Sequence, residues 1–153
     1  MRMKLSRREM LASLMLLPAV ASAQAPDNAV QVYKDPTCGC CDRWVEHLRK
    51  AGFTVKVTNA ADMNVVKDSY RVPAKARSCH TGVVAGYALE GHVPAADVKR
   101  LLATRPSGVI GLAVPGMPIG SPGMEVGGGR VQPYEVLAFD RAGKTTTFAK
   151  HGT

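Results

Sequence analysis

The sequence predicts one mixed α/β domain that follows a short export signal. Segments with the two-residue period of strands alternate with segments of helical spacing, and a region rich in Gly and Pro comes after them. Of the 153 residues, 46% are hydrophobic and 21% are charged, which excludes a disordered chain. This length suits one compact core and is too short for two sizeable domains.

The first 23 residues contain the three parts of an export signal. Basic residues between positions 2 and 8 precede the apolar run 11–17, and Ala21-Ser22-Ala23 predicts cleavage after Ala23. The apolar stretch has about ten residues where a spanning helix needs about twenty, so we expect no membrane anchor. Residues 6–11 also resemble a twin-arginine motif, and both this route and the Sec route remain open. The expected location is the periplasm.

Strands are expected where apolar and polar residues alternate, and helices where apolar residues recur three or four positions apart. The helix around Trp44, Val45 and Leu48 has this spacing, and Gly52 suits the position just after its end. The predicted order is strand 29–33, helix 42–51, strand 53–57, helix 62–70, strands 82–87 and 88–93, and helix 94–104.

This order is that of the thioredoxin/glutaredoxin arrangement, β-α-β-α-β-β-α, which we assign to residues 24–106. The following residues, 107–153, are expected to form a C-terminal extension. The Gly/Pro/Met-rich segment 106–129, where this extension begins, shows no periodicity, and a structureless segment of this length inside a small domain is either disordered or functional. We expect it to fold back over the domain, held by a terminal β-hairpin of residues 134–139 and 144–148.

Three cysteines lie between the first predicted strand and the first helix, in the sequence Cys38-Gly39-Cys40-Cys41. Cys38 and Cys41 alone form a C-x-x-C at the place where thioredoxin-like proteins carry their redox pair. A helix N-terminus favours thiolate, which is both the nucleophile and the metal ligand. Since a dithiol exchanger needs only two thiols, the third, Cys40, favours a thiophilic metal such as Cu(I) or Zn(II).

Two further segments are expected to reach the same loop. Cys79-His80 precedes the third strand, which runs antiparallel to the first in a thioredoxin-like sheet, so both residues would face Cys38. The fourth strand reverses direction again and would bring His92 back to this edge.

Two methionines lie in turns stiffened by Pro and Gly, outside any apolar periodicity. Met117 is in Val114-Pro115-Gly116-Met117-Pro118, and Met124 is in Ser121-Pro122-Gly123-Met124-Glu125. A thioether is a soft ligand that suits Cu(I) and suits zinc poorly. The methionines therefore favour copper over zinc.

Each of these residues also has a plain structural interpretation. Exported cysteines most often form structural disulfides, and four could pair as two bridges, although the adjacent Cys40 and Cys41 make this awkward. Cys79 as a lone buried thiol, His80 and His92 as packing or capping residues, and the two methionines as core fillers remain open.

The other notable residues are expected to play no part in the site. We expect His47 and His151 to face solvent and Trp44 to pack in the core. Removal of the predicted signal lowers the formal net charge from +8 to +5, and the remaining basic residues form no run and are not interleaved with aromatic residues. A nucleic-acid partner is therefore not expected.

Six segments, taken in order, carry a family resemblance. They are 35–44, 78–81, 86–87, 90–95, 111–118 and 120–125. They resemble the CopG-type family of periplasmic copper-resistance proteins, over residues 30–148. The resemblance implies a thioredoxin fold with a metal-binding extension, a cysteine-bridged multinuclear copper site, and interconversion of Cu(I) and Cu(II).

Carried over to this sequence, the resemblance implies a set of soft ligands. The sulfur ligands would be Cys38, Cys40, Cys41 and Cys79, completed by Met117, Met124, His80 and His92. The expected function is copper binding with Cu(I)/Cu(II) interconversion, in which Cys38 and Cys41 supply the redox chemistry. The alternatives are a copper buffer or chaperone without turnover, and a thiol–disulfide oxidoreductase. The expected partners are copper ions and periplasmic efflux or chaperone proteins, and the protein is expected to be a monomer.

Overall fold

The computed structural model describes residues 27–152. The predicted export signal, its cleavage after Ala23 and the twin-arginine motif lie outside these residues. Among the described residues, none of the helices combines the length and apolarity that crossing a membrane requires.

The described chain forms a seven-stranded mixed sheet in the order β2-β1-β3-β4-β5-β6-β7. The strands are β1 (Ala29–Lys34), β2 (Thr54–Asn59), β3 (His80–Val84), β4 (Tyr87–Glu90), β5 (Val109–Ala113), β6 (Tyr134–Asp140) and β7 (Thr145–His151). The helices are α1 (Gly39–Lys50), α2 (Met63–Ser69) and α3 (Ala95–Thr104), with a 3-10 turn, η1, at Ala74–Ala76. The mixed α/β class is therefore confirmed.

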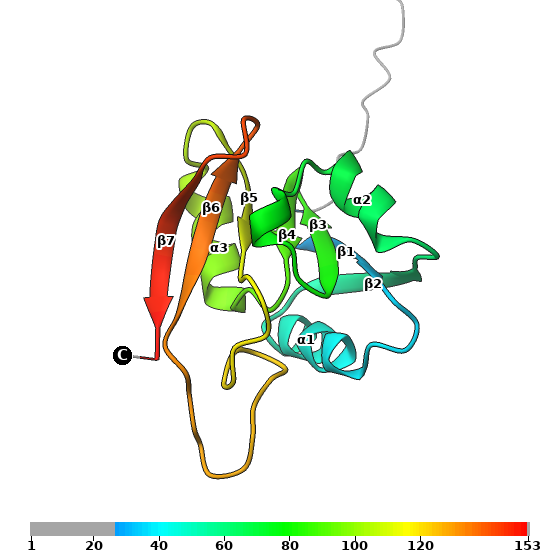
Figure 1. Ribbon diagram of the computed structural model, residues 1–153, viewed down its shortest axis with the longest axis vertical. Helices are drawn as coiled ribbons and strands as arrows, with labels where there is room; N and C mark the ends of the chain where they lie inside the picture. The colour runs from blue at the N-terminus through cyan, green and yellow to red at the C-terminus, as the bar shows by residue number, and fades with distance from the viewer. Residues whose placement is uncertain (1–26, 153) are drawn as a thin grey trace, which may run out of the picture.

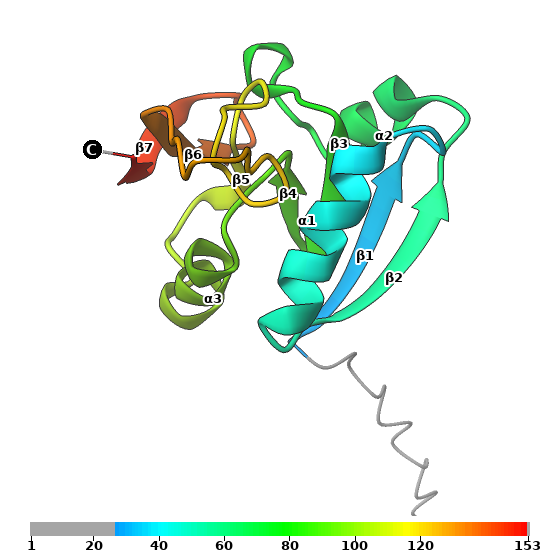
Figure 2. The ribbon, with the colours of Figure 1, turned by 90° about the horizontal axis from the view of Figure 1, so that it is seen from below.

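Helices cover both faces of the sheet, and α1 and α2 lie on opposite sides of the β1–β2 end (Figure 1). The main core is formed where α1 and α3 pack on one face, and it includes Trp44, Leu48, Val98 and Leu101. A smaller cluster on the other face gathers around Phe139. Figure 2 shows α1 lying along β1 and β2 with α3 beside it.

Helix α1 begins three residues earlier than the predicted helix, because the cysteines occupy its first turn. Cys41, Trp44, Val45 and Leu48 form its buried face. The chain leaves the helix through Gly52, whose φ of +95° an L side chain rarely adopts. The predicted stop is observed.

Two predictions about the strands were wrong. The turn between β3 and β4 lies at Ala85-Gly86, both with positive φ, and not between residues 87 and 88. Residues 106–129 were expected to be structureless, but Val109–Ala113 form strand β5, parallel to β4. A strand buried on both faces shows no alternation in its sequence, so its period was hidden.

Strand β5 joins the terminal hairpin to the rest of the sheet. It pairs with β4 on one side and with β6 on the other. At Gly111 a Cβ would lie 2.5 Å from the carbonyl oxygen of Ala88 and 2.4 Å from the ring of Phe139, so only glycine fits there. The predicted terminal hairpin is observed as β6 and β7, anchored by this strand.

Candidate metal centre

The loop between β1 and α1 places the three cysteines of the C-x-C-C segment at the start of the helix. The Asp35 carboxylate accepts hydrogen bonds from the Thr37 N–H (2.8 Å) and hydroxyl (2.5 Å), which fix the turn and lower the pKa of Asp35. Cys38 is the N-cap residue and is bonded to Cys41 in a disulfide. Cys40 and Cys79 are free thiols. The alternative of two structural bridges is therefore not what the structure shows.

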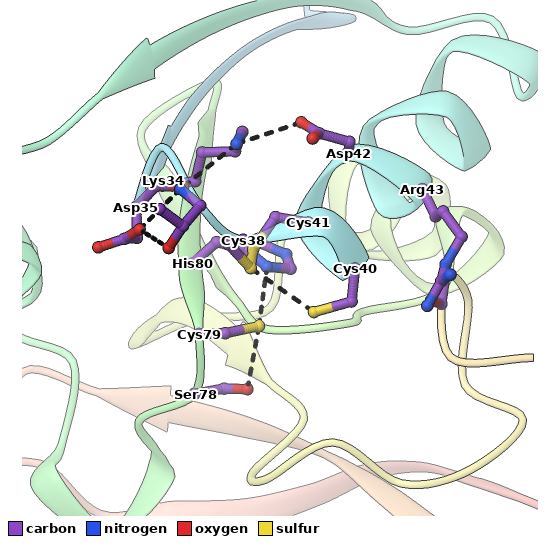
Figure 3. The surroundings of a disulfide bond; sticks show 12 residues. Lys34, Asp35, Cys38, Cys40, Cys41, Asp42, Arg43, Ser78, Cys79 and His80 are labelled. Carbon is purple, nitrogen blue, oxygen red and sulfur yellow. Dashed lines mark hydrogen bonds and ion pairs between the residues drawn. A yellow bond between two sulfur atoms is a disulfide. The ribbon is translucent and has the colours of Figure 1, made fainter.

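The register of the sheet brings Cys79 to these cysteines. β3 runs antiparallel to β1, and Lys34, the last residue of β1, pairs with His80. The four cysteine sulfurs all lie within 4.8 Å of one another, and those of Cys38 and Cys40 are 3.5 Å apart. Figure 3 shows the side chains of Cys40 and Cys79 beside the disulfide.

Cys79 also belongs to a second group of potential ligands, with two buried histidines. Its sulfur lies 3.2 Å from Nδ1 of His80 and 3.3 Å from Nε2 of His92. His92 comes two residues after the end of β4, as the predicted strand directions require. The C-x-C-C segment, Cys79-His80 and His92 thus meet at one edge of the sheet.

The protonation state of His92 follows from its partner. Its Nδ1 lies 2.7 Å from the carbonyl oxygen of Pro122, which can only accept, so Nδ1 carries the proton. Burial lowers the pKa of His92 and keeps the ring neutral. Its Nε2 lone pair is therefore directed at Cys79, as in metal-binding histidines whose other nitrogen is held by a carbonyl.

His80 is fully buried against Trp44, with 4.3 Å between the ring centroids. Burial, followed by the charges of His92 and Lys67, lowers the pKa of His80 well below its usual value. Among the described residues its Nε2 has no hydrogen-bond partner. A buried polar atom without a partner is costly in free energy, which favours a role for the ring beyond packing.

Cys79 is protonated at neutral pH when no metal is bound. Burial, together with Cys40, raises the pKa of its thiol to about 11. Since a thiolate is the form that binds metal, a metal ion at this sulfur has to displace the proton.

The segment between β5 and β6 folds back over the first turn of α1, as expected. The carbonyl oxygen of Gly123 accepts a hydrogen bond from Arg43 Nε (2.8 Å), and that of Gly116 accepts one from the Ser78 hydroxyl (2.5 Å). Gly123 has a φ of +88°. It also lies so close to α1 that a Cβ at this position would be 2.8 Å from the backbone nitrogen of Trp44. Together with the Pro122–His92 contact, these bonds tie the segment to both groups of donors.

The two methionines are placed by the turns that this segment forms. Met124 is half-buried and lies next to Gly123 over the start of α1. Met117 follows Gly116 and is 53% exposed. Met117 is therefore more exposed to solvent than Met124.

Two histidines that were expected to face solvent are instead half-buried and paired. His47 Nε2 accepts a hydrogen bond from the N–H of Ala95 at the start of α3 (3.0 Å). His151 Nε2 lies 2.6 Å from the Asp97 carboxylate. Both expectations were wrong because α3, which is distant in the sequence from both histidines, packs beside them: Ala95 contacts His47 of α1, and Asp97 contacts His151 of β7.

Sequence reasoning also missed the polar residues that hold this centre. Arg43, Ser78 and Glu90 contact the loops that carry the donors. In the sequence they look like ordinary surface residues, and only the Ser-Cys-His run at 78–80 hinted that Ser78 lies near the site.

The donor set matches the chemistry of soft metals. The two groups share Cys79 and contain two free thiols, Cys40 and Cys79, and two neutral imidazoles. Cys38 and Cys41 add two more thiolates once their disulfide is reduced. Thiolate and imidazole suit Cu(I) and zinc, whereas calcium and magnesium prefer oxygen ligands. The residues present therefore fit a thiophilic metal ion.

Comparisons with known proteins identify the family of the chain. Residues 76–124 match the family described as "Protein of unknown function, DUF411". The solved structure of "Copper resistance protein copG- Form 1" has 44% identity and a TM-score of 0.78, covering 84% of this chain and 100% of that chain. "Copper resistance protein copG- Form 2" has 45% identity and a TM-score of 0.76, covering 81% and 98%. A search of curated protein sequences found no match.

Proposed function

The chain belongs to the CopG family of copper resistance proteins, and we propose that it is an exported copper-binding protein of the periplasm. The observation that carries this proposal is the pair of donor groups that share Cys79. Soft thiolates and neutral imidazoles are the ligands that Cu(I) prefers. In this proposal the C-x-C-C segment belongs to a thioredoxin-like domain (24–106), and residues 107–153 form the extension that covers the metal site and ends in the β-hairpin.

The number of donors supports a site for more than one copper ion. Six side chains converge, whereas one tetrahedral ion takes four ligands. The ligands are Cys38, Cys40, Cys41, Cys79, His80 and His92, with Met124 and Met117 added from the covering segment. Cys79, the residue common to both groups, is the natural bridge between two ions.

The disulfide beside the free thiols supports interconversion of Cu(I) and Cu(II). Reduction of the Cys38–Cys41 bond takes up two electrons and yields two thiolates. This balances the oxidation of two Cu(I) ions, the substrate in this reaction, to Cu(II). In the reverse direction the two thiolates return the electrons and the bond forms again.

The binding proposal is tested by counting metal ions. The mature protein is reduced, freed of metal and reconstituted anaerobically with Cu(I) and Zn(II) in competition. We expect more than one copper per chain, and fewer in Cys79→Ser and Met124→Ala. Met63→Ala, also half-buried but located in α2, is the matched control and should bind as the wild type does. Tight zinc with weak copper would overturn the proposal.

The redox proposal needs a separate test. The disulfide form is mixed anaerobically with Cu(I), and Cu(II) is measured by electron paramagnetic resonance while free thiols are counted. Two Cu(II) ions per reduced disulfide are expected. A copper buffer or chaperone that hands Cu(I) to a periplasmic efflux partner would produce no Cu(II) and no new thiols.

The Cys38–Cys41 disulfide also favours a second candidate, a thiol–disulfide oxidoreductase. That function predicts insulin reduction by the metal-free protein, lost in Cys38→Ser and unchanged in Met117→Ala. Copper-dependent chemistry predicts no insulin reduction without metal.

A further inference from the structure

A buried ion pair lies next to the cysteine–histidine centre, outside its set of donors. Lys67 of α2 and Glu90, the last residue of β4, are both buried, and the Lys67 Nζ lies 2.5 Å from Glu90 Oε1. Helix α2 packs against β1 and β3, so the lysine enters from the face of the sheet opposite to α1.

The Glu90 carboxylate contacts the chain on both sides of Cys79-His80. Its Oε1 accepts a hydrogen bond from the N–H of Ser78 (2.6 Å), and its Oε2 accepts one from the hydroxyl of Thr81 (2.7 Å). Lys67 also donates to the Thr81 hydroxyl (3.2 Å). Glu90 therefore holds both ends of the segment 78–81, which carries the Cys79 sulfur and the His80 imidazole.

The same glutamate is two residues from His92, and the two segments are tightly packed. The N–H of Gly91 donates to the carbonyl oxygen of His80 (3.0 Å). A Cβ on Gly91 would lie 2.7 Å from that of Ser78, so no side chain fits between the segments. Glu90 therefore connects the segment 78–81 to the segment 90–92, and this connection fixes the position of Cys79 relative to His80 and His92.

Fold stability alone does not account for such a pair. Replacing a buried ion pair by apolar residues of similar volume is often neutral or stabilising, because the desolvation of two charges offsets their attraction. Residues that hold metal ligands in place, by contrast, typically change metal affinity about 10- to 100-fold when they are replaced.

We propose that Glu90, held by Lys67, is a positioning residue that fixes the Cys79 sulfur against the nitrogens of His80 and His92. The inference rests on the proposed copper-binding function. Neither Lys67 nor Glu90 hydrogen-bonds a donor atom of the centre, and the pair acts through the hydrogen bonds to Ser78 and Thr81.

Two double variants separate positioning from charge. Lys67→Met with Glu90→Gln removes both charges but keeps an acceptor for the Ser78 N–H and a partner for Thr81. Lys67→Met with Glu90→Leu is equally uncharged and lacks both hydrogen bonds. The two proteins differ at residue 90 alone, and neither leaves an unpaired buried charge.

Two measurements are made on each protein. The first is the rate at which iodoacetamide alkylates Cys79 in the metal-free protein, followed by mass spectrometry with Cys40 as the internal reference. The second is the Cu(I) dissociation constant, from anaerobic competition with a chromophoric chelator. We expect the glutamine variant to stay within about 3-fold of the wild type in both, and the leucine variant to bind Cu(I) at least about 10-fold more weakly, with faster alkylation of Cys79.

A folded leucine variant with wild-type alkylation and affinity would overturn the inference. If that variant does not fold, Thr81→Val removes one contact to Glu90 with no change in charge and is expected to give a smaller change in the same direction. Wild-type behaviour of Thr81→Val would then contradict the inference. Failure of the proposed function looks different, because the wild type itself would bind no copper.

Discussion

Gly123→Ala is expected to lift the covering segment from the first turn of α1. The added Cβ would lie 2.8 Å from the backbone nitrogen of Trp44 and 3.0 Å from the carbonyl oxygen of Cys40. Both are backbone atoms of a helix, so the covering segment has to move. The backbone at Gly123 also has a φ of +88°, which an alanine adopts at a cost of about 1–2 kcal/mol.

The magnitude follows from these two effects. Movement of the segment breaks the hydrogen bond from Arg43 to the Gly123 carbonyl, which contributes about 1.5–3 kcal/mol as a bond to a charged group. The total loss is therefore about 2.5–5 kcal/mol if the segment detaches. Detachment also removes the Pro122 carbonyl from His92 Nδ1, so Cu(I) affinity should fall as well.

Gly128→Ala is the matched control for this substitution. Gly128 lies in the same segment and has a φ of +86°, but a Cβ there meets no atom within 4 Å. It therefore carries only the cost of the backbone conformation, about 1–2 kcal/mol.

The free energy of unfolding of both variants is measured by urea denaturation, with the fluorescence of Trp44, the single tryptophan of the chain, as the signal. Copper affinity is measured by chelator competition. Equal losses of stability and unchanged copper affinity in the two variants would show that contact between Gly123 and α1 does not hold the covering segment in place.

Three further predictions concern the donors and their surroundings. Because burial raises the pKa of Cys79 to about 11, its alkylation in the metal-free protein should increase with pH up to that value, and a plateau near pH 9 would be contradictory. Burial lowers the pKa of His80 and His92, so the unfolded state binds more protons; the unfolding free energy should fall as the pH drops below about 6.5, and less so in His80→Gln. If the unfolding free energy of His80→Gln falls as steeply with pH as that of the wild type, His80 is not the cause of the pH dependence. Cys40→Ser should leave the Cys38–Cys41 disulfide intact but lower the number of bound copper ions, and an unchanged count would exclude Cys40 as a ligand.

The sequence predicted the elements whose signals are local. The helix around Trp44, its stop at Gly52 and the terminal hairpin all depend on short-range spacing and turn residues, and they are observed. Strand β5 was missed because both of its faces are covered. Its successive residues Leu112 and Ala113 point to opposite faces and are both buried, which removes the alternation that identifies a strand.

The cysteines and histidines of the site were identifiable, but their supports were not. The approach of Cys79 and His92 to Cys38 followed from the directions of consecutive strands. By contrast, Lys67 and Glu90 pair across 23 positions, and a lysine in a short helix normally indicates a solvated surface. Only the packing of α2 on the sheet brings that lysine to the buried carboxylate.

X-ray absorption at the copper edge is the sharpest test of copper binding at this centre, because it reports the atoms around the metal. For the fully reduced protein loaded anaerobically with Cu(I), we predict a shell of sulfur with some nitrogen and a short copper–copper distance that is lost in Cys79→Ser. A spectrum with oxygen and nitrogen neighbours only, or an isolated copper ion unaffected by that substitution, would contradict the account.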